Sequence, residues 1–92
     1  MPKSIHRQEA QVLIELLREL RSEAGLTQTE LSTRLGRVQS FISDVERGQR
    51  RLDLVQLRDI VVVLGSTLSG FVQEFERRVD RAGRGGRRKG GD

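Results

Sequence analysis

The 92-residue sequence predicts an all-α fold built from five helices. Apolar residues recur every three or four positions along most of the chain, which is the period of a helix with one buried face. Gly25, Gly36, Gly48 and Gly65 each follow such a stretch, at the place where a residue with positive φ commonly ends a helix. The run 60–64 alone resembles a buried strand, but it continues a helical spacing and the sequence offers no second strand to pair with it.

The first helix is predicted to run from about Ser4 or Glu9 to Ala24. Its apolar residues recur at helical spacing, while its charged residues lie on the other faces. The residues predicted for the apolar face are Leu13, Leu16, Leu17, Leu20 and Ala24.

The second helix is predicted to begin after Thr27 and to end near Leu35. Thr27 and Glu30 have the spacing of a capping box, in which each side chain bonds a free backbone amide at the start of the helix. Leu31 and Leu35 are expected to face inward.

The third helix is predicted over about 38–47, with Val38, Ile42 and Val45 on its apolar face. Its other face is polar and consists of Gln39, Ser40, Ser43, Asp44 and Arg47. Asp53 is the predicted N-cap of the fourth helix, whose inward residues are Leu54, Leu57, Ile60, Val61 and Leu64.

The fifth helix is predicted over about 67–82, with an apolar stripe of Leu68, Phe71, Val72, Phe75 and Val79. Residues 83–92 contain no apolar side chain, so we expect a disordered Arg/Gly tail after one domain over 1–82. The net charge of +4 lies mostly in this tail, because 1–82 carry 13 Lys/Arg against 12 Asp/Glu. The charge by itself is therefore weak evidence for a nucleic-acid partner.

The composition excludes several classes of site. The chain has no cysteine and a single histidine, His6, so it lacks the residues for a disulfide, a zinc site or a histidine-based catalytic triad. We expect no enzyme activity, metal or cofactor. No apolar run approaches the roughly 20 residues that span a bilayer, and the N-terminus lacks a signal-peptide pattern, so we expect a cytoplasmic protein without a membrane partner.

The most informative unit is 28–47, two short helices joined by a turn at Gly36. Gly36 permits the sharp turn that sets the second helix across the first. Ser32 lies where the two helices are expected to cross, and only a small residue fits there. The shared apolar seam consists of Leu31, Leu35, Ile42 and Val45.

Residues 21–65 resemble the phage-repressor (Cro/C1, or Xre) helix-turn-helix family through the signature AGLTQTEL…LG…QSFIS..ERG. The resemblance implies a five-helix lambda-repressor-like DNA-binding domain. Two residues depart from the family pattern. Arg37 stands where an apolar residue is usual, and Val38 stands where Ser or Pro usually begins the third helix; Val38 cannot cap a helix by side-chain hydrogen bonding.

In this family the third helix enters the major groove and its N-terminal residues meet base edges. Carried over by position, the resemblance implies base contacts by Gln39, Ser40, Ser43 and Asp44. The amide of Gln39 suits adenine, which it can bond at N6 and N7. For Asp44 two roles stay open: accepting a hydrogen bond from cytosine N4, or repelling phosphate.

A second set of residues is predicted to contact phosphates. Thr27 and Gln28 begin the second helix, where free amides and the helix dipole favour an anion. A mostly basic group adds Arg37, Arg47, Gln49, Arg50 and Arg51. The resemblance also implies a structural ion pair between Arg21 and Glu46, which fixes the third helix to the first.

The resemblance implies a sequence-specific transcriptional regulator, a repressor that binds double-stranded DNA at a palindromic operator. We expect a homodimer, because one reading helix contacts too few base pairs. Its candidate contacts are Leu68, Phe71, Val72 and Phe75, for which simple packing is the other interpretation. The alternatives are an antitoxin or adaptor whose main partner is a protein such as a toxin, and a restriction–modification controller.

Overall fold

The computed structural model describes residues 7–84, which form five α-helices and no strand. In chain order the helices are α1 (Gln8–Glu23), α2 (Gln28–Arg34), α3 (Phe41–Glu46), α4 (Leu54–Val63) and α5 (Leu68–Arg84). This confirms the predicted all-α, five-helix fold. The alternative start of the first helix at Ser4 and most of the predicted tail, residues 85–92, lie outside the described residues.

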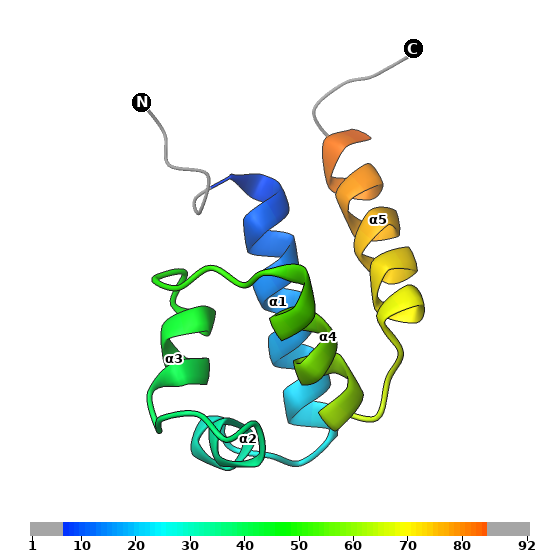
Figure 1. Ribbon diagram of the computed structural model, residues 1–92. Coiled ribbons are helices and arrows are strands. Elements are labelled where there is room, and N and C mark those ends of the chain that lie inside the picture. The colour runs from blue at the N-terminus through cyan, green and yellow to red at the C-terminus, as the bar shows by residue number, and fades with distance from the viewer. Residues whose placement is uncertain (1–6, 85–92) are drawn as a thin grey trace.

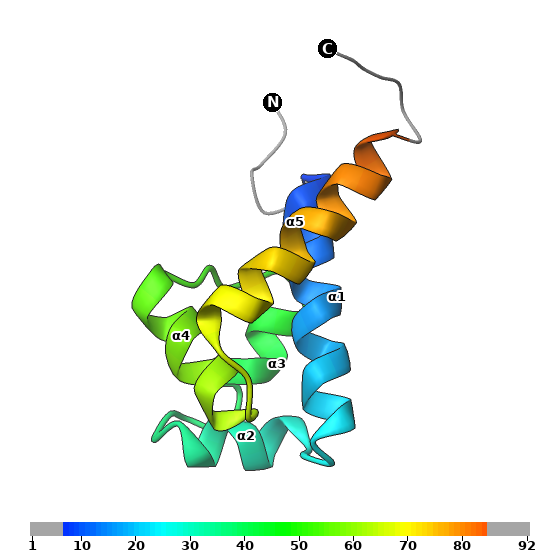
Figure 2. The same ribbon diagram turned by 90° about the vertical axis from the view of Figure 1, so that its right-hand side faces the viewer.

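The helices surround one apolar core (Figure 1). α1 packs on α3 and α5, α2 packs on α3 and α4, and α4 packs on α5. In Figure 1, α3 and α5 lie on opposite sides of α1 and α4, and Figure 2 shows α5 crossing over α1. The buried core residues are Leu16, Leu17, Leu31, Phe41, Ile42, Val45, Ile60, Val61 and Phe71.

The predicted glycine-terminated helix ends are present in the structure. The four glycines have φ between 71° and 85° and follow α1, α2, α3 and α4. At the end of α2, Gly36 N–H donates to Thr33 O (2.9 Å) and Arg37 N–H donates to Ser32 O (2.9 Å). This pair of bonds is a Schellman motif, which ends α2 sharply and sends the chain across it towards α3.

The structure corrects the predicted start of the third helix. α3 begins at Phe41, so Val38, Gln39 and Ser40 form a turn before it. Val38 is 72% exposed and does not share the apolar face of Ile42. The physical reason is that Val38 supplies no capping oxygen, whereas Phe41 N–H donates to Val38 O in a tight turn (3.0 Å).

α4 has the predicted N-cap, but one residue predicted to face inward is exposed. Asp53 Oδ1 accepts from Gln56 N–H (2.7 Å), and Gln56 Oε1 accepts from Asp53 N–H (3.0 Å), which completes a capping box. Ile60 and Val61 are buried as expected, but Leu54 is 65% exposed. The spacing of apolar residues indicates which face of a helix is apolar. It does not indicate how much of that face the neighbouring helices cover.

α5 ends two residues later than predicted, because it continues to Arg84. Phe71 is 4% exposed and belongs to the core, while Val72 beside it is 39% exposed. Arg78 binds Glu19 of α1 through two hydrogen bonds of 3.0 and 2.9 Å. These contacts fix α5 along α1.

No single helix within 7–84 is both long and apolar enough to cross a membrane. α4 and residues 68–82 of α5 meet that criterion of length and composition only when taken together, as a pair bent by 105°.

Candidate nucleic-acid interface

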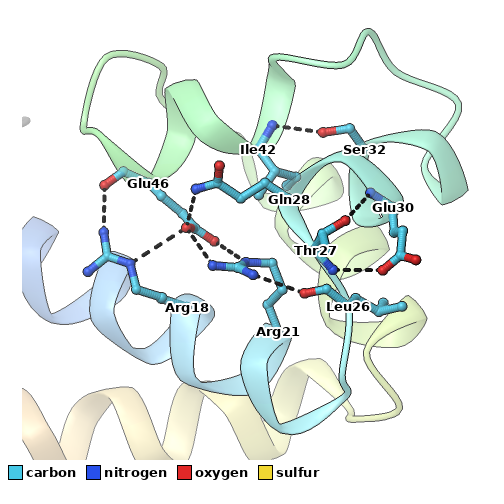
Figure 3. A network of polar contacts seen from close by, with 9 residues as sticks. All are labelled: Arg18, Arg21, Leu26, Thr27, Gln28, Glu30, Ser32, Ile42 and Glu46. Atoms are coloured by element: carbon cyan, nitrogen blue, oxygen red, sulfur yellow. Dashed lines mark hydrogen bonds and ion pairs between the residues drawn. The ribbon is translucent and has the colours of Figure 1, made fainter.

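The predicted pair of Arg21 and Glu46 forms the centre of a polar network between α1, α2 and α3 (Figure 3). Arg21 donates from Nε to Glu46 Oε2 (2.7 Å) and from Nη2 to Glu46 Oε1 (3.0 Å). Gln28 of α2 donates from Nε2 to the same Oε1 (2.8 Å). Arg18 donates from Nη2 to the Glu46 carbonyl (3.0 Å). Three side chains from two helices therefore hold the last residue of α3.

The network compensates a buried charge. The Glu46 side chain is only 3% exposed, and burial by itself raises the pKa of its carboxyl. The hydrogen bonds from Arg21 and Gln28 and the charges of Arg21 and Arg18 oppose this effect, and the pKa of Glu46 is lowered below its ordinary value. Arg21 also donates from Nη1 to Leu26 O (2.9 Å), so the turn after α1 is held as well.

The start of α3 is fixed by a residue of α2. Ser32 is completely buried, and its Oγ accepts a hydrogen bond from Ile42 N–H (3.0 Å; Figure 3). A hydroxyl that accepts from an amide in the first turn acts as an N-cap, which Val38 cannot do. The sequence analysis placed Ser32 at the crossing of the two helices because of its small size. Its capping role was missed, because this role depends on a contact with a residue ten positions away.

The predicted base-contacting residues gather on the surface between α2 and α3. A hollow of about 330 Å³ is lined by Gln28, Thr29, Val38, Gln39, Ser40 and Ser43. Gln39 and Ser40 are exposed in the turn before α3, and Ser43 lies in its first turn. Asp44 is apart from this hollow and forms an ion pair with Arg47, its neighbour three residues on.

The predicted phosphate-contacting residues fall into three groups. Thr27 completes the expected capping box with Glu30, with bonds of 3.0 and 2.8 Å. The side-chain amide of Gln28 donates to Glu46, whereas its expected phosphate contact depends on the backbone amides at the start of α2 and stays a prediction. The remaining residues are exposed on the turns flanking α3: Arg37, Arg47, Gln49, Arg50 and Arg51.

The sequence analysis missed two residues that contribute contacts to this surface and to the Glu46 network. Phe41 lies in the core, and the guanidinium carbons of Arg37 and Arg50 are 4.7 and 5.0 Å from its ring centroid. The spacing of Arg37 and Phe41 was a signal for this contact, although the structure places the arginine outside the helix. Arg18 precedes Arg21 by three residues and therefore shares its helix face, which was a signal for its place in the network.

Within residues 7–84 no group of three or more histidine or acidic side chains is arranged to hold a metal ion. The chemistry on this surface is that of hydrogen-bonding amides and hydroxyls beside guanidinium groups. Such groups recognise base edges and phosphates.

Comparison with known proteins agrees with this arrangement. Residues 13–69 match a helix-turn-helix domain family. An uncharacterised HTH-type transcriptional regulator, y4dJ, of Sinorhizobium fredii is 41% identical over 46 residues; the match covers 50% of this chain and 60% of the relative, so the chain spans about three fifths of its length.

Solved structures show the same fold. An XRE-family-like protein from Pseudomonas syringae pv. tomato is 41% identical, with a TM-score of 0.75 over 82% of this chain and 92% of that one. The restriction–modification controller C.Esp1396I, as a tetramer in complex with its natural 35-base-pair operator, has a TM-score of 0.70 at 22% identity, over 78% of this chain and 95% of that one. The matched family and the Pseudomonas relative together assign the class: this chain belongs to the XRE-type helix-turn-helix family of DNA-binding transcriptional regulators.

Proposed function

We propose that the chain is a sequence-specific repressor that binds a palindromic operator as a homodimer, with the turn 38–40 and α3 in the major groove. The observation that carries this proposal is the fixation of α3 at both ends. Ser32 caps its start, and the Glu46 network holds its end, while Gln39 and Ser40 remain exposed beside them. A reading element must be held rigidly by groups that do not themselves face the DNA.

The chemistry of the exposed turn fits base recognition. Gln39 carries a side-chain amide that bonds adenine at N6 and N7 in a bidentate manner, and the hydroxyls of Ser40 and Ser43 can donate or accept. The ion pair between Asp44 and Arg47 is compatible with both roles considered for Asp44.

The position of α5 fits the proposed homodimer. α5 lies on the opposite side of the molecule from α3 (Figure 1), so a contact between two copies through α5 leaves both reading elements free. Phe71 is taken up by the core of its own chain, which leaves Leu68, Val72 and Phe75 as candidate contacts. The operator-bound tetramer of C.Esp1396I supports an assembly of several copies on DNA.

Selection of binding sites from a pool of random duplexes tests the proposal. The wild-type chain should enrich a two-fold symmetric site, since two related reading elements contact half-sites about 34 Å apart. Gln39→Ala should lose the base preference at one symmetric pair of positions in the selected site. It should keep the affinity of the wild-type chain for duplexes of unrelated sequence. The matched control is Gln73→Ala, which removes an exposed amide from α5.

Two outcomes would contradict the proposal. Enrichment of the same site by Gln39→Ala would remove Gln39 from base recognition. Failure of the wild-type chain to enrich any sequence would contradict sequence-specific binding itself.

A further inference from the structure

Two arginines from different segments contact the ring of Phe41. Arg37 lies in the turn before α3, and Arg50 lies in the loop after it. Their guanidinium carbons are 4.7 and 5.0 Å from the ring centroid, within the roughly 6 Å at which a cation is attracted to an aromatic face. One ring therefore joins the two segments that flank α3.

Phe41 is suited to act as a fixed platform. Its side chain is 4% exposed and belongs to the core cluster, where close packing restricts its rotamers. Arg37 and Arg50 are themselves exposed, so their guanidinium groups remain accessible to solvent while they contact the ring.

The two charges lack carboxylate partners in the described part of the chain. Among residues 7–84, Arg47 pairs with Asp44, whereas no ion pair involves Arg37 or Arg50. Asp59 lines the same small hollow as Arg37 without forming an ion pair with it. Because both guanidinium carbons are near one centroid, they are no more than about 10 Å apart. Two unneutralised cations held this close favour an anion between or beside them.

We propose that Phe41 is a positioning residue that holds Arg37 and Arg50 as a paired phosphate clamp. This inference rests on the proposed binding of duplex DNA. Successive phosphates of one DNA strand are separated by about 3.4 Å along the helix axis, so the pair can bind one phosphate or two neighbouring ones. Ordering two flexible side chains before binding removes part of the entropy cost of ordering them on the DNA. Phe41 itself need not touch the DNA.

The first test measures the salt dependence of binding to a duplex of random sequence. Arg37→Ala with Arg50→Ala should make the slope of log K against log salt shallower by about 0.9 for each phosphate that the variant no longer neutralises. The matched control is Arg58→Ala, which removes an exposed charge from α4. If the wild-type chain binds no duplex, the proposed function fails. If it binds and the double variant behaves like the control, only the clamp fails.

The second test is a double-mutant cycle that separates positioning from packing. Phe41→Leu should weaken DNA binding about 5- to 30-fold, the fold-change expected for losing the order of two side chains, whereas Phe41→Tyr should retain affinity within about twofold. In the background lacking both arginines, Phe41→Leu should have no further effect on affinity. An equal loss in both backgrounds would overturn the positioning role.

A third measurement does not depend on the folding of any variant. In the free wild-type protein, the ring of Phe41 should shift the side-chain δ-proton NMR signals of Arg37 and Arg50 away from those of Arg58. Shifts equal to those of Arg58 would show that the arginines are not held on the ring, and would overturn the proposal.

Discussion

At the scale of single residues, the structure depends on one buried charge. Glu46 is 6% exposed, yet it lies at the end of the helix that we propose reads DNA. A buried carboxylate is costly unless it is paired and hydrogen-bonded, and here it accepts three side-chain hydrogen bonds. The pair contributes less to net stability than its bond count suggests, because desolvation opposes it. Its structural effect is to give α3 a single position relative to α1 and α2.

Glu46→Ala should lower the free energy of unfolding by about 3 kcal/mol, because it leaves the half-buried Arg21 without its carboxylate partner. Glu23→Ala, which removes an exposed carboxylate near the end of α1, should change it by less than about 0.5 kcal/mol. Thermal or urea unfolding at neutral pH measures both. Equal stability of the two variants would contradict the structural role of the network.

The same residue sets part of the pH dependence of stability. The folded-state pKa of Glu46 is lowered from its ordinary value of 4.5, so the unfolded chain takes up the proton more readily. Its contribution is complete above about pH 4.5 and is lost as the pH falls. Glu46→Gln, which does not titrate, should show a shallower loss of stability below this pH than the wild-type chain. If the free energy of unfolding fell equally with pH in both proteins, the result would contradict the lowered pKa of Glu46.

At the scale of elements, features encoded by near neighbours were predictable from the sequence. The Thr27–Glu30 capping box, the Asp53 cap and the glycine-terminated helix ends all depend on residues within one helical turn. The start of α3 was not predictable in this way, because its cap comes from Ser32 in another helix. Leu54 was misassigned for a related reason, since its exposure depends on where neighbouring elements stop.

For the candidate interface, the positions of residues in the fold were more predictable than the contacts of their side chains. The family pattern indicated Gln39, Ser40 and the Arg21–Glu46 pair, which are fixed by their place in the motif. It did not indicate that Gln28 turns towards Glu46, because that contact depends on the distance between α2 and α3 after packing. The contact of Arg50 with Phe41 likewise depends on the course of the loop after α3.

Ser32→Ala tests the link between α2 and α3. The substitution leaves the Ile42 amide without its acceptor and should lower the free energy of unfolding by about 1–2 kcal/mol. Compared with the wild-type chain, the variant should show faster amide hydrogen exchange in the first turn of α3 and unchanged exchange in α1. Ser22→Ala is the control, because Ser22 is exposed near the end of α1. Unchanged exchange in α3 would show that the serine does not cap it.

At the scale of the whole molecule, the two proposed functional surfaces are separated by the core. α2 and α3 lie on one side, and α5 lies on the other (Figures 1 and 2). The bonds between Arg78 and Glu19 hold α5 on α1, which in turn carries Arg18 and Arg21 of the network around α3. In the proposed homodimer, this arrangement would leave the turns that we propose read DNA uncovered.

Val72→Glu tests association through α5. Val72 is 39% exposed, so a charge there should leave the fold intact and should lower the mass measured by light scattering to that of one chain. Gln73→Glu adds the same charge at the next exposed position and should keep the mass of the wild-type chain. Equal masses for all three proteins would remove Val72 from the interface.

The most direct test of the proposed reading element is to map which backbone amides respond to DNA. Isotope-labelled protein would be titrated with its selected duplex and followed by NMR. We expect the largest changes at residues 38–44, with smaller changes at Arg37 and Arg50 and almost none on the surface of α4. Changes concentrated elsewhere, with Gln39 and Ser40 unaffected, would contradict the claim that the turn before α3 reads the DNA.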